Sequence, residues 1–137
     1  MKNRKIILER REFEMLDELL RNSSYTDAIN QKCVDTLKNE IKFATIVEDD
    51  EMPDHIVRIN SMVDVETPYG VKHDLQIVVP AERNVEQDKI SVLSPMGSAL
   101  VGYGAGDTVK WMFPKGEGKI KILKVKNAPK SVMRETR

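Results

Sequence analysis

The chain has 137 residues, of which 22 are basic, 22 are acidic and 40% are hydrophobic, a balance typical of a folded globular protein rather than a disordered one. This length allows one domain, or one small domain with an appendage, and excludes a large multidomain machine. Cys33 is the single cysteine, so the chain forms no internal disulfide, and its basic start is followed by too few apolar residues for a signal peptide or membrane span. We therefore expect a cytoplasmic protein without membrane contact.

Two amphipathic helices are predicted in the first third of the chain. From Glu9 to Arg21 the apolar residues recur at spacings of three and four, and a second stripe of the same period runs from Ile29 to Ala44. The polar residues between the stripes are of the kind that end and cap helices. Since two helices joined by a short loop bury their stripes against each other, residues 1–47 are predicted to form a short antiparallel helical hairpin, or short coiled coil.

An acidic run, Glu48-Asp49-Asp50-Glu51, precedes Pro53 and ends the helical part. Like charges repel one another, and the residue before a proline avoids the helical conformation. Residues 48–55 are therefore predicted to be a solvated acidic linker. The adjacent carboxylates lack the spacing and the glycine of a calcium loop, so we expect no cation site here.

After this linker the hydrophobic period changes from about 3.6 to 2. Alternation from Val57 to Glu66 predicts a half-buried strand with Arg58 on its solvent face. The tetrapeptide Thr67-Pro68-Tyr69-Gly70 predicts a turn into an antiparallel strand, which Pro80 ends.

A polar loop over residues 81–88 leads to a third short strand over residues 90–93. Ser94 and the proline after it then predict a short helix over residues 95–101, with Gly102 as its stop. Two further antiparallel strands follow, centred on residues 109–113 and 120–125, and residues 127–137 are expected to be a flexible tail. The predicted class is α+β, with the helical hairpin followed by an antiparallel β-sheet domain over residues 56–126 that contains one short helix.

The residues that carry chemistry in other proteins have structural interpretations in this sequence. Cys33 lies on the apolar stripe of a helix and is expected in the core, while His55 and His73 are expected to be structural. The glycines from Gly102 to Gly106 follow a helix and precede a strand, the reverse of the order in phosphate-binding loops. We therefore expect no catalytic residue, no cofactor and no metal site.

Positive charge gathers late in the chain. Residues 1–54 carry 9 basic and 13 acidic side chains, whereas residues 55–137 carry 13 and 9. Three of these basic residues, Lys119, Lys121 and Lys124, lie on the solvent side of the last predicted strand. They predict either a solvated surface that discourages aggregation or a weak nucleic-acid contact through phosphates.

Several segments of the C-terminal half resemble the C-terminal domain of the bacterial Gre transcript-cleavage factors, over about residues 56–126. These segments are Ile90-Ser91-Val92-Leu93-Ser94-Pro95-Met96-Gly97-Ser98-Ala99-Leu100-Val101-Gly102, Gly106-Asp107-Thr108-Val109 and Pro114-Lys115-Gly116. Within that superfamily, residues 51–61, Trp111 and the short hairpin most resemble the Rnk group, the regulators of nucleoside diphosphate kinase. The resemblance implies an FKBP-like sheet domain and RNA polymerase as the partner.

The resemblance also implies where the polymerase would be contacted. Gre-like proteins dock the C-terminal domain on the rim of the polymerase secondary channel and direct the hairpin inward. Carried over to this chain, the docking corner is Leu93, Ser94, Pro95 and Met96, and the hairpin tip is Ser23, Ser24, Tyr25 and Asp27. In the cleavage factors an aspartate precedes the Ser-Pro pair, whereas this chain has Leu93 there.

The cleavage factors use a longer coiled coil whose tip carries an acidic pair that holds a metal ion at the polymerase centre. This tip offers a single acid, Asp27. We therefore expect a monomeric, non-catalytic regulator that binds core RNA polymerase and competes with Gre factors without stimulating cleavage. The alternatives are a nucleic-acid-binding module that uses the lysines, and a Gre-type cleavage factor in which Asp27 acts with Asp17 or Glu18.

Overall fold

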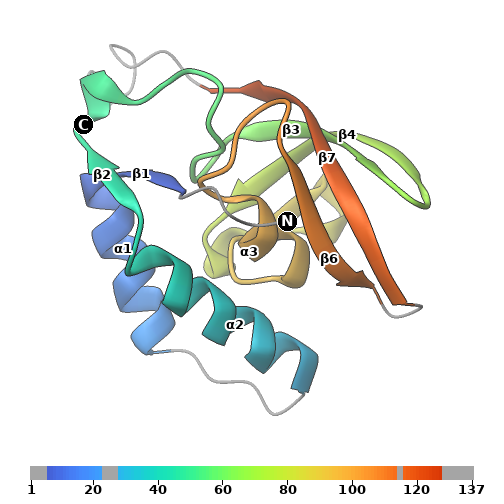
Figure 1. Cartoon of the computed structure of the whole chain (residues 1–137), viewed down its shortest axis with the longest axis horizontal. Coiled ribbons are helices and arrows are strands. Elements are labelled where there is room, and N and C mark those ends of the chain that lie inside the picture. Colours follow the sequence, from blue (N-terminus) through green and yellow to red (C-terminus); the bar gives the residue numbers. More distant parts are fainter. Residues whose placement is uncertain (1–5, 23–27, 114–115, 128–137) are drawn as a thin grey trace.

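The computed structural model describes residues 6–22, 28–113 and 116–127, which form a five-stranded sheet with helices on one side (Figure 1). The sheet has the strand order β5-β4-β3-β7-β6, and all neighbours except β4 and β5 are antiparallel. Its strands are β3 (Met62–Thr67), β4 (Gly70–Val78), β5 (Lys89–Ser91), β6 (Thr108–Phe113) and β7 (Gly116–Lys126). The predicted α+β class is confirmed.

Strand β5 corrects the prediction of a purely antiparallel sheet, because it runs parallel to β4. The chain leaves β4 at Pro80, makes two short 3-10 turns, η2 (Pro80–Glu82) and η3 (Val85–Gln87), and returns to the sheet edge in the same direction. Parallel strands require a crossover of this kind. The alternation within one strand does not reveal the direction of its neighbour, so the sequence pattern missed it.

The turn between β3 and β4 forms at the tetrapeptide predicted for it. Thr67 pairs with Gly70, and the Thr67 hydroxyl donates a hydrogen bond to the Gly70 carbonyl oxygen over 3.0 Å. The same hydroxyl accepts one from the Tyr69 amide, also over 3.0 Å. Gly70 has a φ of 126°, a conformation that side-chain-bearing residues rarely adopt.

The strand predicted from Val57 begins only at Met62. The segment before it turns at Asn60, whose φ is 78°, and the Arg58 amide donates to the Ser61 hydroxyl over 2.6 Å. This turn breaks the alternation that placed Arg58 on the solvent face. Arg58 is instead buried, with 5% of its surface exposed.

Arg58 is surrounded by three carboxylates from earlier parts of the chain, and the four residues are called the Arg58 cluster below. Its Nη2 atom lies 3.1 Å from Glu12, 2.9 Å from Asp49 and 4.0 Å from Glu9. Burial raises the pKa of Glu12, and the hydrogen bond from Arg58 opposes that shift. The prediction of a solvated acidic run is therefore wrong at Asp49, which compensates a buried cation.

Three α-helices accompany the sheet: α1 (Arg10–Arg21), α2 (Ala28–Ile41) and α3 (Pro95–Leu100). The predicted apolar stripes are buried at Leu16 and Leu20 on α1 and at Val34, Leu37 and Ile41 on α2, whereas Met15 is 42% exposed. Cys33 is buried as expected. None of the helices in the described ranges is long and apolar enough to span a membrane.

Two short strands were not predicted. β1 (Ile7–Glu9) and β2 (Thr45–Val47) pair in parallel beside the helices. The apolar stripe predicted a second helix as far as Ala44, but α2 ends at Ile41, before β2 begins. The Ile7 amide also donates to the Gly102 carbonyl oxygen over 3.1 Å, which ties the start of the chain to the segment after α3. Strands of this length are too short to show a period of their own.

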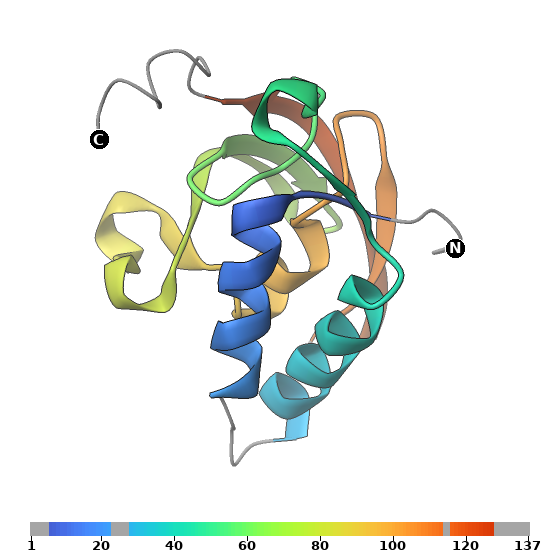
Figure 2. The ribbon, with the colours of Figure 1, turned by 90° about the vertical axis from the view of Figure 1, so that its left-hand side faces the viewer.

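The helices and the sheet share one hydrophobic core. Leu16, Leu20, Val34 and Leu37 of the helices belong to the same buried cluster as the following residues of the sheet domain: Val57, Val63, Val65, Ile77, Leu93, Leu100, Val109, Ile120 and Ile122. Figure 2 shows α1 and α2 side by side, and α2 also packs against α3. The hydroxyl of buried Tyr103 donates to Glu40 of α2 over 3.2 Å, a further link between the two parts.

Candidate docking site

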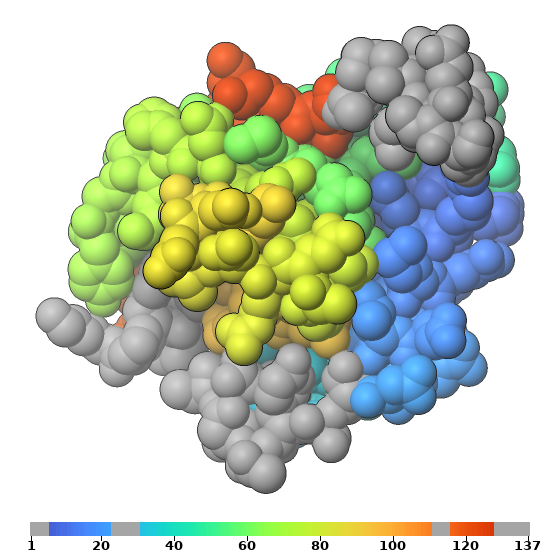
Figure 3. All heavy atoms as spheres, turned by 180° about the vertical axis from the view of Figure 1, so that it is seen from behind, coloured from blue at the N-terminus to red at the C-terminus, as the bar shows by residue number. Residues whose placement is uncertain are grey.

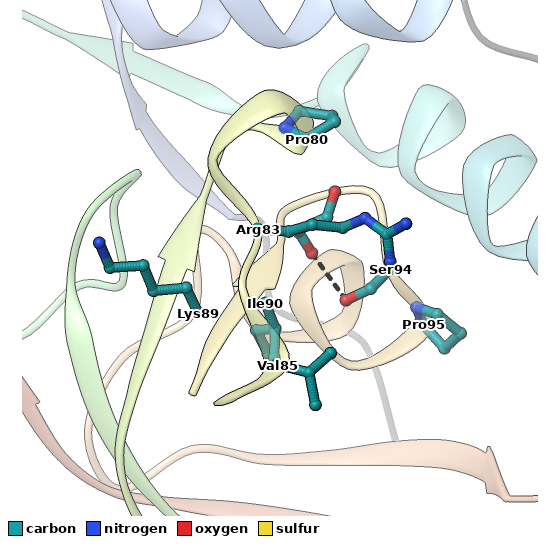
Figure 4. Close-up of a pocket in the computed structure, with 8 residues that line it drawn as sticks. Pro80, Arg83, Val85, Lys89, Ile90, Ser94 and Pro95 are labelled. Carbon is teal, nitrogen blue, oxygen red and sulfur yellow. Dashed lines mark hydrogen bonds between the residues drawn. The ribbon is translucent and has the colours of Figure 1, made fainter. Parts of the chain in front are cut away.

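The corner between β5 and α3 is held by a local hydrogen-bond network centred on Ser94. The Ser94 hydroxyl accepts from the Gly97 amide over 3.0 Å, which caps the helix, and donates to the Ser91 carbonyl oxygen over 2.6 Å (Figure 4). Pro95 occupies the first turn, where its missing N–H costs no helical bond. The short helix and cap predicted from the sequence are confirmed.

The four residues expected at this corner do not all reach the surface. Leu93 is 1% exposed and packs in the core, while Ser94, Pro95 and Met96 are half-buried and lie at the surface. A partner could therefore contact the last three directly. Leu93 supports them from inside.

A cleft of about 380 Å³ opens beside this corner. It is lined by residues of the crossover, of β5 and of the start of α3: Pro80, Arg83, Val85, Lys89, Ile90, Ser91, Ser94 and Pro95. The segment that contains them forms a prominent part of one face of the molecule, the same face on which α1 lies (Figure 3). Val85 is 79% exposed, the largest exposed fraction among the large hydrophobic residues that the structure describes as exposed.

Most of the cleft was not predicted, because its walls come together through the parallel crossover. The one signal in the sequence is Val85, an isolated aliphatic residue in an otherwise polar loop. In the structure the loop closes on itself, since Asn84 and Lys89 exchange backbone hydrogen bonds of 2.9 Å. This closure places Val85 at the lip of the cleft.

We expect Ser94→Ala to lower the free energy of unfolding by about 1 kcal/mol, the usual effect of losing a helix N-cap. The substitution leaves the Gly97 amide without its acceptor and removes the donor to the Ser91 carbonyl. Urea denaturation measures the change. Ser94→Thr keeps the hydroxyl and should lose less, so equal losses in the two variants would contradict this role.

The residues expected at the hairpin tip, Ser23, Ser24, Tyr25 and Asp27, lie outside the described residues. Of the two acids suggested as helpers, Asp17 forms an ion pair of 3.1 Å with Arg21 one helical turn later, and Glu18 is exposed. Neither acid is buried, so both are well solvated.

The three lysines of the last strand are exposed on β7, as expected. Their neighbours are mixed: Lys119 pairs across the strands with Lys110, Lys121 with Glu66 and Lys124 with Asp64. Acidic residues thus stand opposite two of the three. His73 is exposed, and its ring lies 3.3 Å from Asp64.

Comparison with known proteins identifies one matching family and relatives that belong to it. Residues 52–127 match the family described as transcription elongation factor GreA/GreB, C-terminal. The chain is 33% identical over 118 residues to transcription elongation factor GreA of Clostridium botulinum strain Hall, covering 81% of this chain and 73% of that protein. It is 36% identical over 116 residues to GreA of Clostridium kluyveri strain ATCC 8527, covering 80% and 72%.

Among solved structures, the chain is similar to a prokaryotic transcription elongation factor GreA/GreB from Nitrosomonas europaea. The TM-score is 0.73 at 30% identity, and the match covers 91% of this chain and 100% of that one. The likeness therefore extends over the helices as well as the sheet.

Proposed function

The chain belongs to the GreA/GreB family of transcription elongation factors, and from this premise we propose that it binds RNA polymerase near the secondary channel. Members of this family are transcription factors rather than enzymes. The observation that carries the proposal is the corner at Ser94, Pro95 and Met96, a capped helix start beside an open cleft, within the matched region. A surface fixed in this way offers a partner its contacts without further ordering.

We further propose that the protein is a non-catalytic, Rnk-like regulator that occupies the polymerase site of Gre cleavage factors without stimulating cleavage. In this proposal α1 and α2 form a short helical hairpin on an FKBP-like domain, and the protein acts as a monomer in the cytoplasm. The helices of 12 and 14 residues are about 18 and 21 Å long at 1.5 Å per residue. These helices share a hydrophobic core with the sheet domain, which supports the proposal that they extend only a short distance from it.

A Gre-type cleavage factor is the second candidate, favoured by relatives that are themselves named transcription elongation factor GreA. In that case Asp27 would act with Asp17 or Glu18. The ion pair between Asp17 and Arg21 weighs against Asp17 as a free metal ligand. A nucleic-acid contact through Lys119, Lys121 and Lys124 is the third, and the acids opposite Lys121 and Lys124 weaken it.

The test is binding of the fluorescently labelled chain to core RNA polymerase, followed by titration with an unlabelled Gre cleavage factor. We expect displacement by that factor and weaker binding of the Pro95→Ala, Met96→Ala double variant, because both side chains lie at the surface of the corner. Tyr69→Ala is the matched control, since Tyr69 is 59% exposed at the distant β3–β4 turn. The absence of binding, or equal binding by both variants, would contradict docking through this corner.

A cleavage assay on arrested elongation complexes separates the first two candidates. We expect no cleavage with this chain alone, and suppression of cleavage when it is added before the Gre factor. Cleavage stimulated by the wild-type chain and lost in Asp27→Ala would instead establish the second candidate.

A further inference from the structure

The cleft beside the docking corner combines apolar walls with positive charge. Pro80, Val85, Ile90 and Pro95 supply the apolar surface, and the charged residues among its lining are Arg83 and Lys89. The acids of the same loop, Glu82, Glu86 and Asp88, are exposed but do not line the cleft. The charged residues that line the cleft are therefore both basic.

The two cations are placed differently. In Figure 4 the Arg83 side chain points toward Ser94 and Pro95, whereas the amine of Lys89 points away from them. Within the part of the chain that the structure describes, neither makes an ion pair with a carboxylate. Arg83 thus presents its guanidinium beside the corner with no acidic partner among the described residues.

The backbone around Arg83 is fixed at both ends. The Arg83 amide donates to the Pro80 carbonyl oxygen over 3.3 Å, and the next residue, Asn84, is held by its paired hydrogen bonds with Lys89. The Asn84 side chain also caps η3 by accepting from the Glu86 amide over 3.1 Å. The base of the Arg83 side chain is therefore positioned before any partner arrives.

We propose that Arg83 sets the specificity of the docking site, by selecting a segment of RNA polymerase that carries a carboxylate next to an exposed apolar side chain. The apolar side chain would enter between Val85 and Pro95, and the guanidinium would pair with the carboxylate. The planar fork of an arginine suits a carboxylate that it can bind through two N–H groups. This proposal rests on the proposed function.

The residue before Ser94 adds no charge to the corner. Leu93 is apolar and buried, with 1% of its surface exposed. The charge beside the corner therefore comes from Arg83. A partner surface that suits it is acidic.

The test measures the affinity of full-length variants for core RNA polymerase at several salt concentrations. We expect Arg83→Glu to weaken binding about tenfold or more, because it places like charges together at the interface. Arg83→Lys keeps the charge without the fork and should weaken binding less. Val85→Asp should also weaken binding, because it introduces a charge where the apolar side chain enters.

Two charge reversals serve as matched controls. Lys89→Glu makes the same change on a lining residue whose amine points away, so its effect should be smaller than that of Arg83→Glu. Lys72→Glu makes it on an exposed residue of β4 about 20 Å from the end of that strand, at about 3.3 Å per residue, and should bind like wild type. Wild-type binding should also fall more steeply with salt than binding of Arg83→Gln.

The outcomes separate this inference from the proposed function. If wild type binds and Arg83→Glu binds equally well or more tightly, the role of Arg83 is wrong while docking stands. If wild type does not bind polymerase at all, the proposed function fails and this inference fails with it.

Discussion

Replacing Arg58 with alanine should lower the free energy of unfolding by about 3–5 kcal/mol, the usual cost of removing one partner from a buried ion pair. The guanidinium faces Glu12, Asp49 and Glu9, whose side chains are at most 12% exposed. Without it, these carboxylates lie together in a poorly hydrated place and repel each other. Chemical denaturation followed by circular dichroism measures the loss.

An exposed ion pair provides the control for this prediction. Arg10 and Glu48 lie 2.6 Å apart, but more than half of each side chain is exposed. Arg10→Ala should therefore cost less than about 1 kcal/mol. Adding Glu12→Gln to Arg58→Ala should recover part of the stability, because it removes one uncompensated charge. Arg58→Ala as mild as Arg10→Ala would show that the Arg58 cluster does not hold the two parts together.

The second large effect is expected at Gly97, where alanine should cost about 3 kcal/mol through overpacking. A Cβ atom at this position would lie 2.1 Å from the Ser91 carbonyl oxygen and 3.0 Å from the Val92 Cα. Both are backbone atoms, so neither can move aside as a flexible side chain would. The helix α3 must shift away from β5, which distorts the corner and the cleft together.

Gly106→Ala is the comparison for that variant. Gly106 has a φ of 93° and open space around it, so alanine there adds backbone strain of about 1–2 kcal/mol without a clash. Thermal denaturation should rank Gly97→Ala as the less stable variant. In the polymerase titration Gly97→Ala should bind more weakly than Gly106→Ala, and the reverse order in either measurement would count against the tight approach of α3 to β5.

The elements with a local cause could be predicted from the sequence. Three features are of this kind: the apolar stripes of α1 and α2, the turn from Thr67 to Gly70, and the helix cap at Ser94. Each depends on residues that are close together in the sequence. Their residue types and spacing carry the information. The four residues expected at the docking corner are consecutive in the sequence, and the structure shows that one of them, Leu93, is buried.

The elements with a distant cause could not be predicted in this way. Arg58 is buried because carboxylates at positions 9, 12 and 49 surround it, and no local pattern links these positions. The cleft needs Pro80 and Val85 to meet Pro95, which follows from the parallel direction of β5. Alternation assigns a residue to a face of its own strand and says nothing about what covers that face.

The common core of the helices and the sheet has a consequence for the entropy of association. If a solvated linker tethered the helix pair, the helices would move relative to the sheet domain. A partner that bound both parts would then have to restrict this motion, which would make the free energy of binding less favourable. The Arg58 cluster and the hydrogen bond from Tyr103 to Glu40 restrict that motion during folding instead. A partner that binds the corner at Pro95 therefore also fixes the orientation of α1 and α2 relative to itself, without a further ordering step.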